Sequence, residues 1–180
     1  MQESPLINDY CFREIKSNDK VGSFSLGDKT YQPLKTFLKD YAKDFHTNNI
    51  TKTYVLAENK QSTKIVAYIS LVCSEITLNT EQKPKKINLE RYETFPAVKL
   101  ARLAVDARYR KSGLGRLLMQ AGIAIIQENI MPWVGCRYFL VDSKPNSLRF
   151  YEKYGFILLD HKENETSENP LLLLDMHTIR

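Results

Sequence analysis

The 180-residue sequence contains no long apolar run, and none of its hydrophobic stretches approaches the ~20 residues of a membrane-spanning helix. The first nine residues lack the cationic and apolar succession of a signal peptide. Cysteine is scarce: Cys11, Cys73 and Cys136 are far apart and form no Cys-x-x-Cys pair, which argues against a disulfide framework or a zinc site. We therefore expect reduced, buried thiols, no metal and no membrane partner, in a cytoplasmic protein.

Charge of one sign is only mildly in excess. Lysine and arginine total 26 against 21 aspartates and glutamates, a formal net charge of +5. This balance favours an anionic partner, either a phosphorylated cofactor or RNA, without the charge density of a dedicated nucleic-acid tail. The length is typical of one globular domain, and no repeat or linker divides the chain, so we expect a single domain over residues 1–180.

The segment from Lys99 to Leu118 combines three local signals in the order that phosphate binding requires. An apolar strand over Leu100–Val105 precedes a basic turn over Arg108–Arg116, and apolar residues then recur at helical spacing. The first N–H groups of a helix lack intrahelical partners, and glycines let an anion approach them. We predict that a pyrophosphate binds at Arg110, Lys111, Ser112, Gly113, Leu114, Gly115 and Arg116.

Two familiar phosphate loops do not fit this turn. The Walker pattern ends in Gly-Lys-Ser/Thr, which is missing here, and a dinucleotide fingerprint needs a small residue where Leu118 stands. The plain alternative is a strand-to-helix connection in which the glycines serve the geometry and the arginines serve solubility.

Periodicity predicts a mixed α/β chain in the order β, α, β, β, β, α, β, α, β, β. The expected strands cover residues 11–16, 51–58, 64–77, 100–105, 137–141, 156–159 and 171–176. The expected helices cover residues 31–46, 114 to about 130, and 145–153, the last with Asp142 or Ser143 as N-cap and Gly155 as its stop. We expect residues 51–58 and 64–77 to form an antiparallel hairpin, and residues 79–97 to form a long loop.

Two motifs at a set separation carry a family resemblance. Leu103-Ala104-Val105-Asp106 leads into Arg110-x-x-Gly113-x-Gly115, and further on comes Asn146-x-x-x-Phe150-Tyr151-Glu152-Lys153-Tyr154-Gly155-Phe156. Together they resemble the GNAT superfamily of acetyl-CoA-dependent N-acetyltransferases. The resemblance implies a mostly antiparallel mixed sheet with a central parallel, splayed strand pair and helices on both faces.

The same resemblance assigns the site and the cofactor. It implies acetyl-CoA with its pyrophosphate on the turn and its pantetheine arm beside Leu103, Ala104 and Val105, while the later helix brings Asn146, Phe150 and Tyr151 to the thioester. A narrower resemblance, to the toxin-type branch, rests on Phe24-x-x-Gly27, Thr53-Tyr54-Val55 and residues 101–106. Members of that branch acetylate the amino group of aminoacyl-tRNA. An antitoxin protein and a second copy of the chain stay open as partners.

Direct attack of an amine on the thioester requires an oxyanion donor and an acid for the leaving thiolate. A main-chain N–H of the Leu103–Val105 strand is the expected donor, and Tyr151 is the expected acid. Reference pKa values of about 10 for tyrosine and about 8.5 for a thiol make this proton transfer uphill by roughly 2 kcal/mol. Tyr154 shares a helix face with Tyr151, so spacing leaves both open, and the resemblance selects Tyr151.

No carboxylate or histidine stands out as a general base, and His46 is more typical of a surface histidine at a helix end. An α-amine, with a pKa near about 8, is partly neutral at physiological pH, whereas a lysine side chain near about 10.4 is not. The sequence therefore favours an α-amino acceptor.

Four cations are candidates for acceptor binding. Arg102 either lines the acceptor site or emerges at the sheet edge. Lys85, Lys86 and Arg91 either form a basic surface with it for RNA phosphates or belong to a solvated loop.

Three functions are therefore weighed. The first is a toxin-type aminoacyl-tRNA N-acetyltransferase, the second a GNAT enzyme acting on a protein N-terminus or a small amine, and the third a non-catalytic RNA-binding module of the same fold.

Overall fold

The structure, a computed structural model, describes residues 10–85, 87–160, 164 and 166–179. The segment tested for a signal peptide and Lys86 lie outside the described residues. The strands are β1 (Cys11–Glu14), β2 (Lys52–Ala57), β3 (Ile65–Thr77), β4 (Thr94–Val105), β5 (Tyr138–Asp142), β6 (Ile157–Leu158) and β7 (Leu171–Asp175). The α-helices are α1 (Gln32–Asp40), α2 (Ala42–Thr47), α3 (Leu114–Ala124) and α4 (Leu148–Glu152). Single 3-10 turns cover Lys29–Tyr31, Ala107–Tyr109, Pro145–Ser147 and Met176–Thr178.

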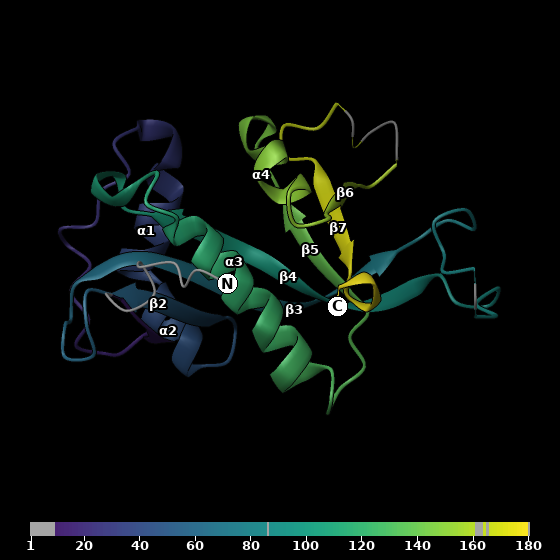
Figure 1. The fold of residues 1–180 in the computed structure, drawn as a ribbon, viewed down its shortest axis with the longest axis horizontal. Coiled ribbons are helices and arrows are strands. Elements are labelled where there is room, and N and C mark those ends of the chain that lie inside the picture. The colour runs from purple at the N-terminus through teal and green to yellow at the C-terminus, as the bar shows by residue number, and fades with distance from the viewer. Residues whose placement is uncertain (1–9, 86, 161–163, 165, 180) are drawn as a thin grey trace, which may run out of the picture. The chain divides into compact units, whose positions relative to one another are not determined.

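The strands form one seven-stranded sheet in the order β1-β2-β3-β4-β5-β7-β6 (Figure 1). The pairs β1–β2, β2–β3, β5–β7 and β6–β7 are antiparallel, whereas β4 and β5 are parallel, with Ala97 opposite Tyr138 and Leu100 opposite Val141. A parallel pair needs a long crossover, and α3 supplies it. The predicted hairpin and the mostly antiparallel sheet with a central parallel pair are confirmed.

The chain divides into two compact units. Unit 1 comprises the chain up to Val72 together with Ala101–Ile123, and unit 2 comprises Cys73–Leu100 and the chain from Ala124 onward. The chain passes from one unit to the other inside β3, β4 and α3. That residues 1–180 form a single domain stays a prediction.

In unit 1, helices α1 and α2 cover one face of the strands. Their core cluster consists of Ile15, Phe24, Leu26, Phe37, Leu38, Ala42, Val55, Ile65, Tyr68 and Ala104. On these strands Leu56, Ala67 and Ile69 are fully buried as well, and α3, which crosses in front of the strands in Figure 1, contributes the fully buried Leu118 and Met119. The apolar spacing that predicted the helices over residues 31–46 and from residue 114 therefore reflects burial on a sheet.

Unit 2 has a core of its own. It consists of Ile76, Leu78, Phe95, Ala97, Tyr138, Leu140, Leu159 and Leu173. The rings of Phe95 and Tyr138 pack edge to face, with centroids 6.1 Å apart. This cluster holds the parallel β4–β5 rungs in place.

The predicted helix over residues 31–46 is divided at Tyr41, whose φ of −128° leaves the helical region. The aromatic rings explain the break. Phe37 and Phe45 would lie about 12 Å apart along a straight helix, yet their ring centroids are 5.9 Å apart. The bend therefore lets both rings enter one aromatic cluster.

The predicted loop over residues 79–97 is wrong at its end, because β4 begins at Thr94. Pro96 suggested a loop, since proline cannot donate to a strand ladder. Its side chain is exposed while its neighbours Phe95 and Ala97 are buried, and its carbonyl accepts a hydrogen bond from Arg137 N at 2.9 Å. Burial on either side of the proline outweighs the missing N–H.

Three smaller expectations also need correction. Neither Asp142 nor Ser143 caps the helix before Gly155; a 3-10 turn with Lys144 at its N-cap and Pro145 at its first position precedes α4. The chain after Ala124 forms a π-helix over Ile125–Ile130. The three cysteines are free, as predicted, but none is fully buried: Cys11 and Cys136 are half-buried, and Cys73 is exposed. Cys73 is exposed because burial alternates along that end of β3.

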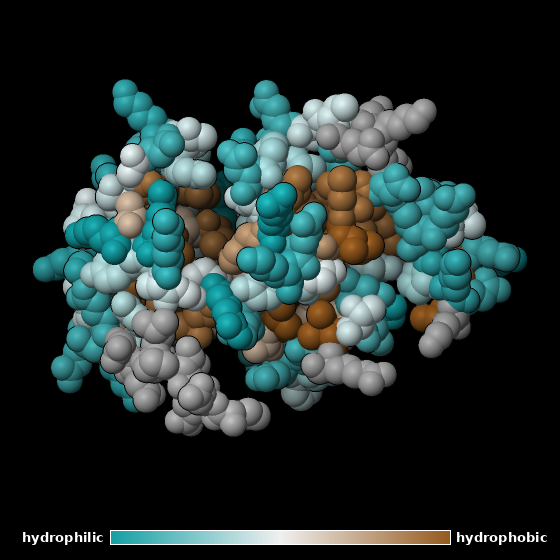
Figure 2. Space-filling view, turned by 45° about the horizontal axis from the view of Figure 1, so that its top comes forward, coloured by the Kyte–Doolittle hydropathy of each residue, from teal (hydrophilic) through white to brown (hydrophobic). Residues whose placement is uncertain are grey.

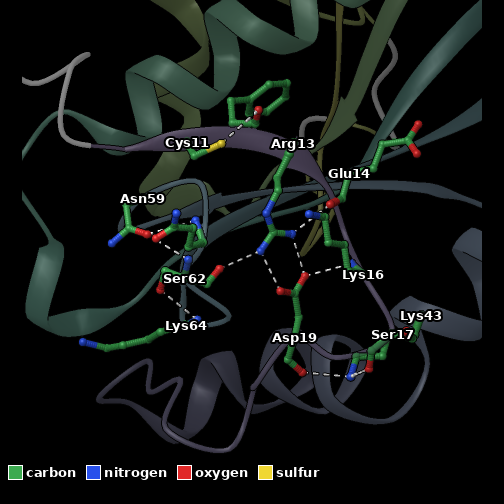
Figure 3. Close-up of polar contacts among 12 residues, drawn as sticks. Cys11, Arg13, Glu14, Lys16, Ser17, Asp19, Lys43, Asn59, Ser62 and Lys64 are labelled. Carbon is green, nitrogen blue, oxygen red and sulfur yellow. Dashed lines mark hydrogen bonds and ion pairs between the residues drawn. The ribbon is translucent and has the colours of Figure 1, made fainter.

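An ion pair closes the loop after β1 (Figure 3). The Arg13 guanidinium donates two hydrogen bonds to the carboxylate of Asp19, at 2.6 and 2.8 Å, and the Asp19 side chain is fully buried. Lys16 N donates to the same carboxylate at 2.8 Å, and Lys43 Nζ donates to the Asp19 carbonyl at 2.8 Å. Hydrogen bonding to Asp19 raises the pKa of Arg13. The loop that joins β1 to the Phe24 segment is thereby held in one conformation.

Over the described residues, no helix is long and apolar enough to cross a membrane, and no group of three or more potential metal ligands occurs. Figure 2 shows mainly hydrophilic residues on one face, with hydrophobic residues grouped between them.

Candidate active site

The predicted anion site is a turn between β4 and α3 in unit 1. The backbone takes positive φ values at Lys111 (63°) and Gly113 (87°). The first intrahelical bond runs from Leu117 N to Gly113 O at 3.1 Å, so the N–H groups just before Leu117 point out of the helix end. Successive N–H groups in such alternating conformations form an anion-binding nest.

The residues of the nest suit a pyrophosphate. Lys111, Gly113 and Arg116 are exposed, so both charge and main chain are accessible to a ligand. A lysine at positive φ is strained, and such strain is typical of functional turns. The contacts of Ser112 are internal, since its hydroxyl hydrogen-bonds to the Tyr109 carbonyl.

Arg110 makes contacts within the protein. Its guanidinium lies 5.5 Å from the centroid of the Tyr31 ring and donates to the Leu26 carbonyl at 2.5 Å. These contacts hold the side chain against the chain segment before α1. A role of Arg110 in pyrophosphate binding stays a prediction.

Two groups of residues that position the turn were not found from the sequence. Asp106 is fully buried, and its carboxylate accepts hydrogen bonds from Ser25 N at 2.9 Å and from Arg108 N, Nε and Nη2 at 2.8–3.0 Å. Tyr109 donates to Glu58 at 2.6 Å and accepts from Lys64 at 3.0 Å. Ser25 is 81 positions from Asp106, and Glu58 is 51 positions from Tyr109, so no local pattern signals these two contacts.

The strand before the turn has one edge free of its parallel partner. Within the described residues, the β4–β5 ladder ends at Leu100 and Val141, so residues 101–105 extend beyond it. Ala104 is buried in the α1 cluster, whereas Leu103 and Val105, which point to the opposite face, are only half-buried. A strand with one unpaired backbone edge and a partly open apolar face can take both a carbonyl and an aliphatic arm.

Tyr151 lies on α4 in unit 2, and its side chain is 9% exposed. Its ring packs edge to face on Phe150 and Phe156, at 5.1 and 5.8 Å between centroids. None of the described residues hydrogen-bonds to its hydroxyl. The hydroxyl oxygen is also absent from the set of buried polar atoms without a partner, so it is accessible to solvent. Burial raises the pKa of Tyr151 to about 12. The ring is fixed while the hydroxyl stays accessible and protonated.

The other predicted residues of unit 2 are placed as follows. Asn146 is exposed in the 3-10 turn before α4, and Phe150 is half-buried. Lys85 and Arg91 are exposed in the connection from β3 to β4, where Lys85 lines a cavity of about 600 Å³. Glu81, Glu90 and Glu93 share that connection, so its basic character is diluted.

The comparisons establish the class of this protein. The family model of the acetyltransferase (GNAT) domain matches residues 25–179. Because the match spans most of the chain, the chain belongs to the GNAT acetyltransferase family, and the predicted family is confirmed.

Three solved structures resemble this chain over most of its length. A tyrosine-to-phenylalanine mutant of KacT is 24% identical, with 95% of this chain and 97% of that chain covered and a TM-score of 0.80. AtaT complexed with acetyl-methionyl-tRNAfMet is 24% identical, with 95% and 97% covered and a TM-score of 0.79. A mutant AtaT toxin bound to acetyl-CoA and to the C-terminus of the antitoxin AtaR is 20% identical, with 95% and 96% covered and a TM-score of 0.75. At these identities the likenesses show the fold.

Gly113→Ala tests the nest. A side chain at this φ costs about 1–2 kcal/mol, and the methyl group would also stand where the anion approaches. We expect the KM for acetyl-CoA to rise about tenfold, with kcat at saturation changed less than threefold. Steady-state kinetics and a melting curve measure both effects.

The matched control is Gly22→Ala, because a Cβ at Gly22 meets nothing within 4 Å. A lowered melting temperature with an unchanged KM for Gly113→Ala would make the turn structural.

Proposed function

We propose that this chain transfers the acetyl group of acetyl-CoA to the α-amino group of an aminoacyl-tRNA and thereby acts as a toxin. Family membership supports acetyl transfer, and the accessible hydroxyl on the buried Tyr151 ring is the observation that carries it. The acceptor is inferred from the likeness to AtaT with acetyl-methionyl-tRNAfMet, and a partner antitoxin from the likeness to AtaT with AtaR.

Some residues of the proposed site would bind acetyl-CoA, and others would stabilise the negative charge that develops during the reaction. The nest from Lys111 to Arg116 would hold the pyrophosphate of acetyl-CoA, which supplies the activated acetyl group. A main-chain N–H of the Leu103–Val105 strand would donate to the thioester oxygen as negative charge develops on it. Tyr151 would donate a hydrogen bond to the leaving thiolate.

The site needs an amine that loses its proton readily. The Asp106 carboxylate already accepts several hydrogen bonds. His46 accepts a hydrogen bond from Thr53 N at 3.1 Å. Because the His46 side chain is only 12% exposed, the expectation of a surface histidine was wrong. The Asp106 carboxylate and His46 Nδ1 are thus already acceptors of backbone N–H groups. An α-amine with a pKa of about 8 meets the requirement.

The pH dependence follows from these groups. A pKa of about 12 for Tyr151 lies about 3.5 pKa units above a thiol, so full proton transfer is uphill by about 5 kcal/mol, more than the reference pKa values suggest. Tyr151 therefore acts as a protonated hydrogen-bond donor. We expect kcat/KM for the amine to rise up to about pH 8 and then to remain level to pH 10. A descending limb near pH 10 that Tyr151→Phe removes would contradict this assignment.

Radiolabelled acetyl-CoA tests the proposed acceptor. The protein is incubated separately with charged tRNA, with uncharged tRNA, and with peptides that have a free N-terminus. We expect label on charged tRNA alone. Label on peptides would favour the protein N-terminus instead, and salt-dependent tRNA binding without any transfer would favour a non-catalytic RNA-binding module.

A further inference from the structure

Arg102 is a charged residue inside an apolar stretch of β4. Side chains two residues apart in a strand point to the same face, so Arg102 shares its face with Ala104. Ala104 belongs to the cluster formed with α1 and α2. Arg102 therefore faces these helices, on the side of the strand opposite Leu103 and Val105.

Two contacts hold the Arg102 side chain in place. Its guanidinium carbon lies 4.8 Å from the centroid of the Phe37 ring, and Nη1 donates to the Ala101 carbonyl at 2.7 Å. Phe37 is itself fixed, because its ring stacks on Tyr68 and packs edge to face on Phe45. One face of the guanidinium is thus covered, and the group is oriented before any ligand arrives.

Arg102 differs from the other half-buried arginines in its charged surroundings. Arg13 pairs with Asp19 and Arg137 with Asp175, each at 2.6 Å. Within the described part of the chain, no carboxylate pairs with Arg102. A guanidinium carries five N–H donors. The remaining nitrogens of Arg102 are absent from the set of buried polar atoms without a hydrogen-bond partner, so they are accessible to solvent. A fixed cation with accessible donors and no partner is suited to an anionic ligand, and its planar fork suits phosphate oxygens.

We propose that Arg102 binds a phosphodiester group near the 3′ end of the acceptor RNA. The inference rests on the proposed function, because an aminoacyl ester has no free carboxylate and the anions close to its amine are phosphodiesters. Arg102 directly precedes the residues expected to hold the thioester, and it points to the face opposite Leu103. It can therefore bind the acceptor without competing for the donor.

The test compares Arg102→Gln and Arg102→Lys with the control Lys39→Gln, which removes an exposed charge from α1. Each protein is assayed with charged tRNA and with an aminoacyl-adenosine, which has the same amine but no phosphodiester. For Arg102→Gln we expect the KM for charged tRNA to rise about tenfold or more, with unchanged KM values for acetyl-CoA and the nucleoside. Arg102→Lys should be intermediate, and Lys39→Gln should match the wild type.

Salt dependence separates a phosphate contact from a packing role. The slope of log KM for tRNA against log salt should fall by about 0.7 in Arg102→Gln and stay constant in Arg102→Lys. An equal loss on tRNA and nucleoside with an unchanged slope would overturn the inference. If Arg102→Gln acetylates tRNA as the wild type does, this inference alone fails. If the wild type does not acetylate charged tRNA at all, both this inference and the proposed function fail.

Discussion

We expect Tyr151→Phe to lower kcat about 100-fold while the KM for acetyl-CoA stays within a few-fold. The phenylalanine ring keeps the contacts with Phe150 and Phe156, so the fold of α4 should survive. Only the hydroxyl is lost, and within the described part of the chain no hydrogen bond holds that hydroxyl. Single-turnover kinetics with saturating acetyl-CoA measure the loss directly.

Tyr154→Phe is the matched control, because it removes a phenol three residues further along from a half-buried ring that also packs on Phe150. Its kcat should change less than threefold. If Tyr154→Phe were the slower enzyme, the acid would have been assigned to the wrong tyrosine. If acetyl-CoA binding collapsed in Tyr151→Phe, Tyr151 would be a binding or packing residue.

Asp106→Asn should destabilise the fold by about 3 kcal/mol, which corresponds to about 6–12 °C in Tm. The carboxylate accepts from two backbone N–H groups and from Arg108 in a fully buried position. An amide places its own N–H₂ against one of these donors. Because Asp106 also joins Ser25 to the start of the turn, the KM for acetyl-CoA should rise as well. Chemical denaturation at pH 7 measures the stability.

The pH dependence of this loss has a definite sign. Burial by itself raises the pKa of Asp106, but the hydrogen bonds from Arg108 and from Ser25 N lower it on balance. A folded-state pKa below the unfolded value of about 3.9 means that the stabilisation is complete at neutral pH and is lost as the pH falls below about 4. The difference between wild type and Asp106→Asn should therefore shrink in acid.

Asp40→Asn is the control for Asp106→Asn, because Asp40 is half-exposed on α1 and should change stability by less than about 0.5 kcal/mol. A difference for Asp106→Asn that grew in acid would mean a raised pKa and a different hydrogen-bonding arrangement.

Most of the fold could be predicted because it follows local patterns. Alternating and apolar runs located the strands, and the two motifs identified the GNAT family. The errors fall where tertiary burial overrode a local signal. Phe37 and Phe45 come together only because the first helix breaks at Tyr41, and β4 begins before Pro96 because the residues on either side of the proline are buried.

The candidate site could also be predicted only where it depends on neighbouring residues. Glycine spacing, cation density and the helix that bears Tyr151 could be found in the sequence, since each depends on neighbours within a few residues. The side chains that hold them could not. Asp106 meets Ser25 across 81 positions, and Tyr109 meets Glu58 across 51. No periodicity reports contacts of that range.

The sequence by itself therefore determined the family, and it predicted the position of an anion-binding turn and a role for Tyr151. Only the tertiary structure decided the surroundings of these groups: it turned Arg110 toward Tyr31, stacked Arg102 on Phe37, and buried the Tyr151 ring. The physical reason is that backbone conformation and helical spacing depend on adjacent residues. Burial, ion pairing and the direction of a long side chain depend on which distant segments pack around it.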